Sequence, residues 1–183
     1  MAKELYVTPL AEVRWCKLVG NARPNTFDPS KPDQWTVELV LDNADKTHAA
    51  WLQEMEDQYE TLHGQKKKHK AAFPWGPDKE APEAKTVVKF KLNQYKRKDG
   101  SVSEGPTLFD SRKNPWPADK EIGNGSKIIV AFSIYAWEGP TGCGLTFQPL
   151  KAQVVDLVEY ERRDSADVFA VVEGGYIDPE MPF

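Results

Sequence analysis

Two stretches of the sequence place lysines and aromatic rings together on the side of a predicted strand that does not face the core. The residues are Lys89, Lys91 and Tyr95 in the strand predicted over 86–95, and Lys127, Ser133, Tyr135 and Trp137 on one face of the strand predicted over 127–137. A lysine ammonium neutralises an anionic group, and an exposed ring stacks on another flat group. Together these side chains suit a flexible polyanion that exposes flat groups along its length.

Three further groups of residues extend this combination of cations and rings. They are Trp15 and Lys17 in the first predicted strand, Lys96, Arg97 and Lys98 in a basic turn, and Arg112, Lys113 and Trp116 in a later loop. Parity alone does not decide which face of the first strand is exposed, and a single aromatic residue is more often a packing residue than a binding platform. A nucleic-acid single strand needs both parts, because cations meet its phosphates and each stacked base contributes about 1–3 kcal/mol.

The net charge of −4 conceals an uneven distribution along the chain. Residues 1–65 carry 6 basic and 11 acidic residues, residues 66–127 carry 15 basic and 8 acidic, and residues 128–183 carry 3 basic and 9 acidic. A basic middle segment favours a polyanionic ligand over a neutral one. Solvated lysines on an ordinary surface are the alternative interpretation.

Common catalytic motifs are absent from the sequence. It contains no Gly-Lys-Ser/Thr phosphate loop, no His-Glu-x-x-His and no Gly-x-Ser-x-Gly. The turn over 123–126 resembles a phosphate cradle only superficially, because no helix is predicted to follow it. Cys16 and Cys143 lack metal-ligand spacing and are expected to be reduced, as in a cytoplasmic protein. We expect a non-catalytic protein without metal or cofactor, and neither a signal peptide nor a membrane-spanning run is predicted.

Periodicity predicts a mainly β protein with one helix. Alternating apolar residues indicate strands over 12–18, 35–41, 86–95, 107–111, 128–137 and 145–160, the last one long or broken at Pro149. A helix over about 45–62, capped by Asn43 or Asp42, is predicted to pack on the body through one apolar stripe. The stripe comprises Trp51, Leu52, Met55, Tyr59 and Leu62. Short strands closing on a modest core, with one inserted helix, predict the OB-fold, a small antiparallel Greek-key barrel.

The predicted organisation is a single-strand-binding domain over 1–160 and a C-terminal tail over 161–183. Within the domain, a mobile basic loop is expected over about 64–84, with Phe73 or Trp75 holding it to the body. The tail tip combines acids and prolines with one terminal ring, and a free carboxylate beside an apolar anchor suits capture by another protein. The predicted partner-binding residues are Asp178, Glu180, Met181, Pro182 and Phe183.

Several segments, taken in order, resemble phage single-stranded DNA-binding proteins that carry an OB-fold, one inserted helix and a C-terminal tail ending in Phe. The matching segments are 1–3, 35–43, 88–91, 110–112, 122–127, 154–159 and Phe183. The resemblance implies a protein of the host cytoplasm that coats single-stranded DNA in replication, recombination and repair. It also implies a tail that contacts polymerase and primase-helicase and shields the DNA groove. The tail here departs from that pattern, because its six acids stand against Arg162 and Arg163.

Two alternatives remain open from the sequence. One is an RNA-binding or strand-annealing OB module, since stacking sites do not by themselves exclude RNA. The other is a structural or interaction β-protein whose lysines keep it soluble. The oligomeric state is also open, a homodimer being one alternative.

Overall fold

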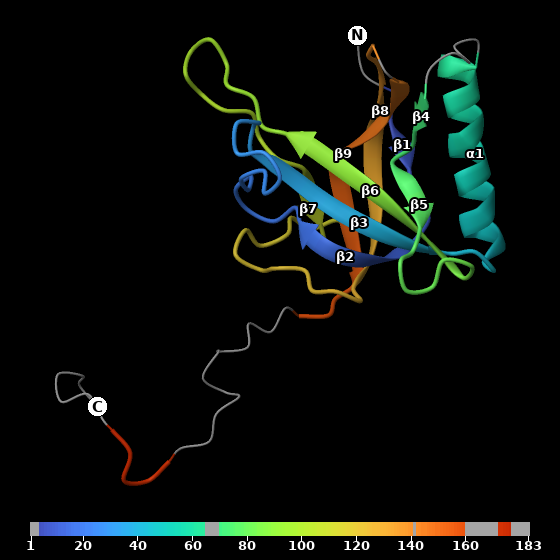
Figure 1. Cartoon of the computed structure of the whole chain (residues 1–183). Coiled ribbons are helices and arrows are strands. Elements are labelled where there is room, and N and C mark those ends of the chain that lie inside the picture. Colours follow the sequence, from blue (N-terminus) through green and yellow to red (C-terminus); the bar gives the residue numbers. More distant parts are fainter. Residues whose placement is uncertain (1–3, 65–69, 141, 160–171, 177–183) are drawn as a thin grey trace.

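One helix and nine strands make up the described part of the structure (Figure 1). The computed structural model describes residues 4–64, 70–140, 142–159 and 172–176. In chain order the elements are β1 (Tyr6–Val7), β2 (Ala11–Lys17), β3 (Gln34–Asp42), α1 (Lys46–His63), β4 (Lys70–Ala72), β5 (Trp75–Pro77), β6 (Lys85–Asn93), β7 (Thr107–Phe109), β8 (Lys127–Glu138) and β9 (Gly142–Asp156). In these ranges, no helix combines the length and the apolar character needed to cross a membrane.

Five of the strands close into a ring. Their order is β2-β3-β6-β9-β8, and β8 pairs again with β2. Neighbours in the ring are antiparallel except β6 and β9, which run parallel. The other four strands are short and extend this ring: β1 pairs with β8, β5 with β6, and β4 and β7 with β9. The prediction of a mainly β chain is confirmed, and a five-stranded Greek-key barrel is the architecture of the OB-fold.

Three phenylalanine rings fill the centre of the barrel. Phe90, Phe132 and Phe147, from β6, β8 and β9, are each at most 1% exposed. Their ring centroids lie 4.7 to 5.7 Å apart, a range in which aromatic pairs attract one another beyond simple burial. Trp51 of α1 meets two of these rings edge-on, at 6.0 and 6.2 Å, so the helix covers one side of the same core.

The cap of α1 differs from the prediction. Asp45 caps the helix, rather than Asn43 or Asp42, by accepting hydrogen bonds from the backbone N–H groups of Thr47 (2.8 Å) and His48 (3.2 Å). Asp42 is the last residue of β3, so its backbone belongs to the sheet. The helix therefore begins only after a short turn has led the chain away from the strand.

The apolar stripe of α1 packs on the barrel as predicted, except at its end. Its buried or half-buried members are Trp51, Leu52, Met55 and Tyr59. Leu62 was predicted to join them and is 45% exposed instead. His63 takes that place because it lies four residues, or about one turn, after Tyr59. It is buried, and its Nε2 donates to the carbonyl of Gly144 at 3.0 Å.

The predicted mobile loop over 64–84 is wrong in part, because β4 and β5 lie within it. Both strands pair with backbone groups that the edges of β9 and β6 leave available. Phe73 and Trp75 stack on each other at 5.0 Å, Phe73 also meets Tyr59 at 4.7 Å, and Trp75 lies 5.8 Å from Phe147. These rings attach the segment to the helix and to the core. The lysine-rich residues 65–69 lie outside the described part.

The strand β9 passes through Pro149 without a break. Pro149 lies opposite Phe132, where the register of β8 shifts between Ala131 and Phe132. Proline has no N–H to contribute to a ladder, and an irregularity of this kind is where a strand tolerates that loss. β9 therefore continues to Asp156, close to the longer of the two predicted alternatives.

Replacing Phe132 by alanine should lower the free energy of unfolding by about 3–5 kcal/mol, because it empties the centre of the barrel. Phe27 is the matched control, since its ring is 98% exposed and Phe27→Ala should change stability by no more than about 0.5 kcal/mol. Urea unfolding measures both. Equal effects of the two substitutions would contradict the assignment of Phe132 to the core.

Candidate functional site

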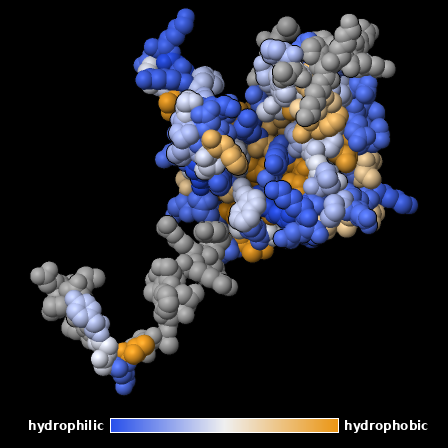
Figure 2. Space-filling view, in the orientation of Figure 1, coloured by the Kyte–Doolittle hydropathy of each residue, from blue (hydrophilic) through white to orange (hydrophobic). Residues whose placement is uncertain are grey.

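A groove crosses the barrel face formed by β2, β3 and β6 and is termed the central groove below. It has a volume of about 750 Å³. The three strands line it, together with the loop over 25–31, residues 72–74, Trp137 of β8 and residues 145–147 of β9. Figure 2 shows this face of the molecule, where orange apolar surface lies recessed between blue hydrophilic side chains. The groove is therefore both open to solvent and partly apolar.

Lysines outnumber acids in the central groove. They are Lys17, Lys31, Lys89 and Lys91, against Asp28 and Glu38. Thr36 pairs with Lys17 on one side and with Lys91 on the other, so the two lysines stand in one row across three strands. Residues that lie directly opposite one another share a face of the sheet. This row gives the groove a concentration of positive charge that attracts a polyanion.

Four aromatic rings line the same groove with much of their surface uncovered. Trp15, Phe27 and Phe73 are 62%, 98% and 47% exposed, and Trp137 is half-buried. Trp137 lies against Gly144, where an added Cβ would come within 2.7 Å of the indole ring. Glycine at that position lets the ring approach the backbone of β9 closely. Rings left exposed in a positively charged groove are suited to stacking on the bases of a nucleic acid.

Trp15 also lines two hollows that adjoin the central groove. One has a volume of about 480 Å³ and contains Lys17, Arg23 and Glu121. The other has a volume of about 570 Å³ and extends toward residues 73–80. The ring of Trp15 thus stands where three depressions meet.

The hollow that extends toward residues 73–80 is lined by slightly more acidic than basic side chains. Arg14 donates to both carboxylate oxygens of Asp78, at 2.9 and 3.3 Å, and Asp78 is buried. This hydrogen-bonded pairing lowers the pKa of Asp78 and raises that of Arg14, so both groups stay charged and engaged with each other. Beside this neutral pair, Glu12, Glu38 and Glu80 line the same hollow against Lys79 and Lys89. An anionic ligand is better matched by the central groove and by the hollow that contains Arg23.

The structure brings together only some of the residues predicted from the sequence. Those that line the central groove are Trp15, Lys17, Lys89, Lys91 and Trp137. Tyr135 is 56% exposed on β8, opposite Thr146, and Lys127 lies at the other end of that strand, opposite Glu12 and Asp156. Ser133 was predicted to share their exposed face, which is wrong, because it is only 2% exposed. The register shift of β8 at Ala131 disturbs the alternation on which that prediction depended.

The predicted basic turn forms a hairpin that projects from the barrel beyond β6 (Figure 1). Gly100 has a φ of +89°, as the predicted Asp99-Gly100 turn requires. The guanidinium of Arg97 lies 5.8 Å from the centroid of Tyr95, and its Nη1 donates to the carbonyl of Val102. Tyr95, Lys96 and Lys98 remain exposed on this projection, which extends one end of the β6 strand rather than lining the groove.

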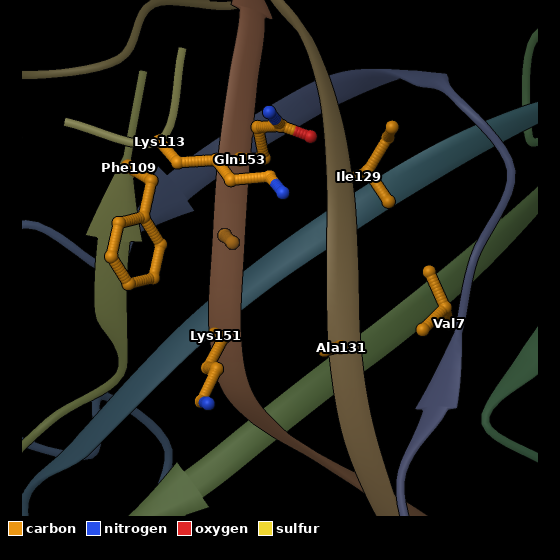
Figure 3. Close-up of a pocket in the computed structure, with 8 residues that line it drawn as sticks. Val7, Phe109, Lys113, Ile129, Ala131, Lys151 and Gln153 are labelled. Carbon is orange, nitrogen blue, oxygen red and sulfur yellow. The ribbon is translucent and has the colours of Figure 1, made fainter. Parts of the chain in front are cut away.

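The predicted loop residues after β7 lie elsewhere. Trp116 is half-buried, and its Nε1 donates to the carbonyl of Lys120 at 2.8 Å, whereas Arg112 is exposed. Lys113 lines a separate hollow of about 290 Å³ between β1, β7, β8 and β9 (Figure 3). Its walls are apolar and include Val7, Phe109 and Ile129. This hollow lacks the combination of several rings and cations found in the central groove.

The sequence did not point to three groove residues. Phe27 and Lys31 belong to the loop before β3, and Phe73 follows β4. An apolar ring isolated in a loop rich in Pro, Asn and Asp was the available signal at Phe27. Lys31 and Phe73 lie in segments without alternating apolar residues. Only the folding of the chain brings these segments to the groove.

The described residues offer no metal centre. They contain no group of three or more His, Cys, Asp or Glu side chains that could hold a metal ion. Cys16 and Cys143 are both buried and free of a disulfide, as expected. Burial raises the pKa of the Cys16 thiol to about 11, so this cysteine is a poor nucleophile.

No protein-family model matches the chain, and no curated sequence matches it. Solved structures do match. The crystal structure of gp2.5, a single-stranded DNA-binding protein encoded by bacteriophage T7, has a TM-score of 0.68 and 19% identity, covering 97% of this chain and 100% of that one. The single-stranded DNA-binding protein from bacteriophage Enc34 has a TM-score of 0.62 and 14% identity, covering 89% of this chain and 88% of that one. Its complex with single-stranded DNA has a TM-score of 0.64 and 14% identity, covering 85% and 88%.

The chain therefore has the fold of phage single-stranded DNA-binding proteins. The resemblance drawn from short sequence segments is confirmed at the level of the fold. These sequence identities are too low to transfer functional residues from the phage proteins to this chain. The candidate site is therefore inferred from the geometry of this chain alone.

Asp78→Asn should destabilise the protein at neutral pH and have a smaller effect as the pH falls. The hydrogen bond from Arg14 lowers the pKa of Asp78. The carboxylate therefore contributes stability above its unfolded-state pKa of about 3.9, and this contribution is lost as the pH falls through the lower folded-state value. Urea unfolding of both proteins between about pH 7 and about pH 3 measures the difference. The exposed Asp119, changed to Asn, is the control, and a difference that stays constant across this range for Asp78→Asn would refute the role of the ion pair.

Proposed function

We propose that the chain is a non-catalytic protein that binds single-stranded DNA along the central groove, with little preference for sequence. The observation that carries the proposal is the presence of exposed rings and lysines in one groove of the described surface. Lysines neutralise phosphates whatever the base, and every base has a flat face to stack on a ring. A duplex hides those faces inside its own stack, so the groove favours a single strand.

The comparisons support the same ligand. Both phage proteins that share the fold are named for binding single-stranded DNA, and the Enc34 protein has been solved in complex with it. Neither their names nor the described residues point to a reaction. We therefore place the chain among the proteins that coat and protect single strands in phage replication, recombination and repair.

RNA binding is the second candidate, since the same rings and lysines stack and neutralise either nucleic acid. A competition titration with DNA and RNA oligonucleotides of equal length separates the two. A protein whose lysines serve only solubility would bind neither, and it would show no dependence of binding on salt.

Tryptophan fluorescence should report tight binding of oligo-dT that weakens as salt rises, with much weaker binding of a duplex of the same length. Lys89→Ala and Lys91→Ala should each lower affinity and reduce the slope of log K against log salt by about 0.7, the value for one phosphate contact on a single strand. Lys151→Ala is the matched control, because Lys151 is also an exposed strand lysine but lines the hollow of Figure 3. Equal binding of duplex and single strand, or an equal effect of all three substitutions, would argue against the groove.

We further propose that the tail over 161–183 recruits replication proteins rather than binding DNA. Apart from residues 172–176, it lies outside the described part of the structure, so its sequence carries the argument. Asp178 and Glu180 would be repelled by phosphates and attracted by a basic surface, and the ring of Phe183 suits an apolar pocket on such a surface.

Deleting residues 177–183 should leave DNA affinity unchanged or slightly higher, most visibly at low salt where the tail acids are least screened. The same deletion should abolish capture of the polymerase or primase-helicase in a pull-down. Phe183→Ala serves as the narrower variant, because it removes the ring and keeps every charge. A truncated protein that kept its partner and lost its DNA would show that the two roles are reversed.

A further inference from the structure

Trp15 has a backbone conformation that bulky residues rarely adopt. Its φ is +51°, and Lys113 is the other non-glycine residue with a positive φ in the described ranges. For a large side chain this region is unfavourable, and such departures persist only where the surroundings impose them. The position lies inside β2, where a regular strand would have been expected.

The irregular conformation decides which way the indole points. Ala11 and Val13 are buried at odd positions, whereas Cys16 and Leu18 are buried at even positions, so the parity of β2 changes at Trp15. The register with β3 shifts over the same residues, between Arg14 and Lys17. Without this bulge Trp15 would follow Val13 into the core. With it, the ring is 62% exposed at the meeting point of three hollows.

The turn before β8 holds the bulge in place. The side chain of Asn124 accepts a hydrogen bond from the backbone N–H of Trp15 at 2.8 Å, across 109 residues of sequence. Next to that contact, the N–H of Gly125 donates to the carbonyl of Val13 at 3.0 Å, and the N–H of Val13 donates to the carbonyl of Ser126 at 2.8 Å. The amide side chain thus supplies an acceptor to a backbone N–H that the bulge has turned away from the ladder.

The turn is itself fixed to the barrel. Gly125 has a φ of +92°, and a Cβ at Gly123 would come within 2.5 Å of the carbonyl of Val158, so both glycines are needed for its shape. The hydroxyl of Ser126 donates to that same carbonyl and accepts from the N–H of Val158, at 3.1 and 2.8 Å. Asn124 is therefore presented to Trp15 by a rigid support.

We infer that Asn124 is a positioning residue of the DNA site, which holds Trp15 in the bulge so that its indole serves as a stacking platform at the end of the central groove. This inference rests on the proposed function. Removing the amide leaves the N–H of Trp15 without its acceptor and frees the bulge to rearrange. The indole of Trp15 is then no longer held in the orientation that stacking on a base requires. The affinity for DNA falls, although every cation and ring of the groove is still present.

A double-mutant cycle tests the inference, with oligo-dT as the ligand at one fixed salt concentration. Trp15→Ala should weaken binding by about fivefold to 150-fold, the range for one stacked base. Asn124→Ala should weaken binding several-fold in the parent and by less than about twofold in the Trp15→Ala background, because it acts through the indole. Equal losses in both backgrounds would show that Asn124 contacts DNA directly and would overturn the inference.

A second measurement reads the bulge itself in the free protein. NMR-detected hydrogen exchange of the Trp15 amide should speed up in Asn124→Ala, while amides in the β8–β9 ladder keep their protection. Asn124→Asp retains an acceptor oxygen and should keep the slow exchange, which makes the test independent of any folding defect in the alanine variant. Unchanged exchange and affinity in Asn124→Ala would overturn the inference alone, whereas a parent that fails to bind oligo-dT would overturn the proposed function.

Discussion

The packing of Phe90, Phe132 and Phe147 inside one small barrel determines which side chains reach its surface. Each ring enters from a different strand, and neighbours along a strand point to opposite faces. Because Phe90 is fixed inward, Lys89 and Lys91 must stand outward. On β8, Phe132 faces inward, and Trp137 near the end of the strand lines the groove. A slip of one residue would exchange the core and the groove on that strand. The composition of the groove is thus a consequence of the core that lies behind it.

Two kinds of geometry meet in the groove. Lys89 and Lys91 come from a regular ladder in which β3 and β6 pair residue by residue. Trp15 comes from a bulge that a distant turn must support. Proteins commonly place such local departures from regularity at binding sites, where a side chain has to be aimed rather than merely exposed. The regular part supplies charge over a length of sheet, and the irregular part supplies one ring at a defined point.

The sequence predicted what depends on periodicity and missed what depends on long-range pairing. The strands around Phe90 and Phe132 were predicted because their alternation is clear. β4 and β5 were not, because three residues carry no period and pair only once the edges of β6 and β9 exist. Parity indicated which residues of β8 face outward, but it did not indicate which of them lie near the groove. Lys127 was therefore included in the predicted site, although it lies at the far end of the strand. The sequence did not indicate which face of β2 carries the side chain of Trp15. That face is determined by the bulge, and the bulge is held by Asn124, which is distant in the sequence.

The long segment between β3 and β6 is not needed for the connectivity of the barrel, but it contributes to the stability of the barrel. Asp42 and Lys85, where the chain leaves and returns, are direct partners in the ladder. A tight turn joining them would preserve the connectivity of the barrel, and everything from 43 to 84 is in that sense an insertion into a hairpin. Yet the insertion carries Trp51, which covers Phe132 and Phe147, and Trp75, which also lies against Phe147. A shortened descendant of this fold would keep its topology and would need new apolar residues to close the uncovered side of its core.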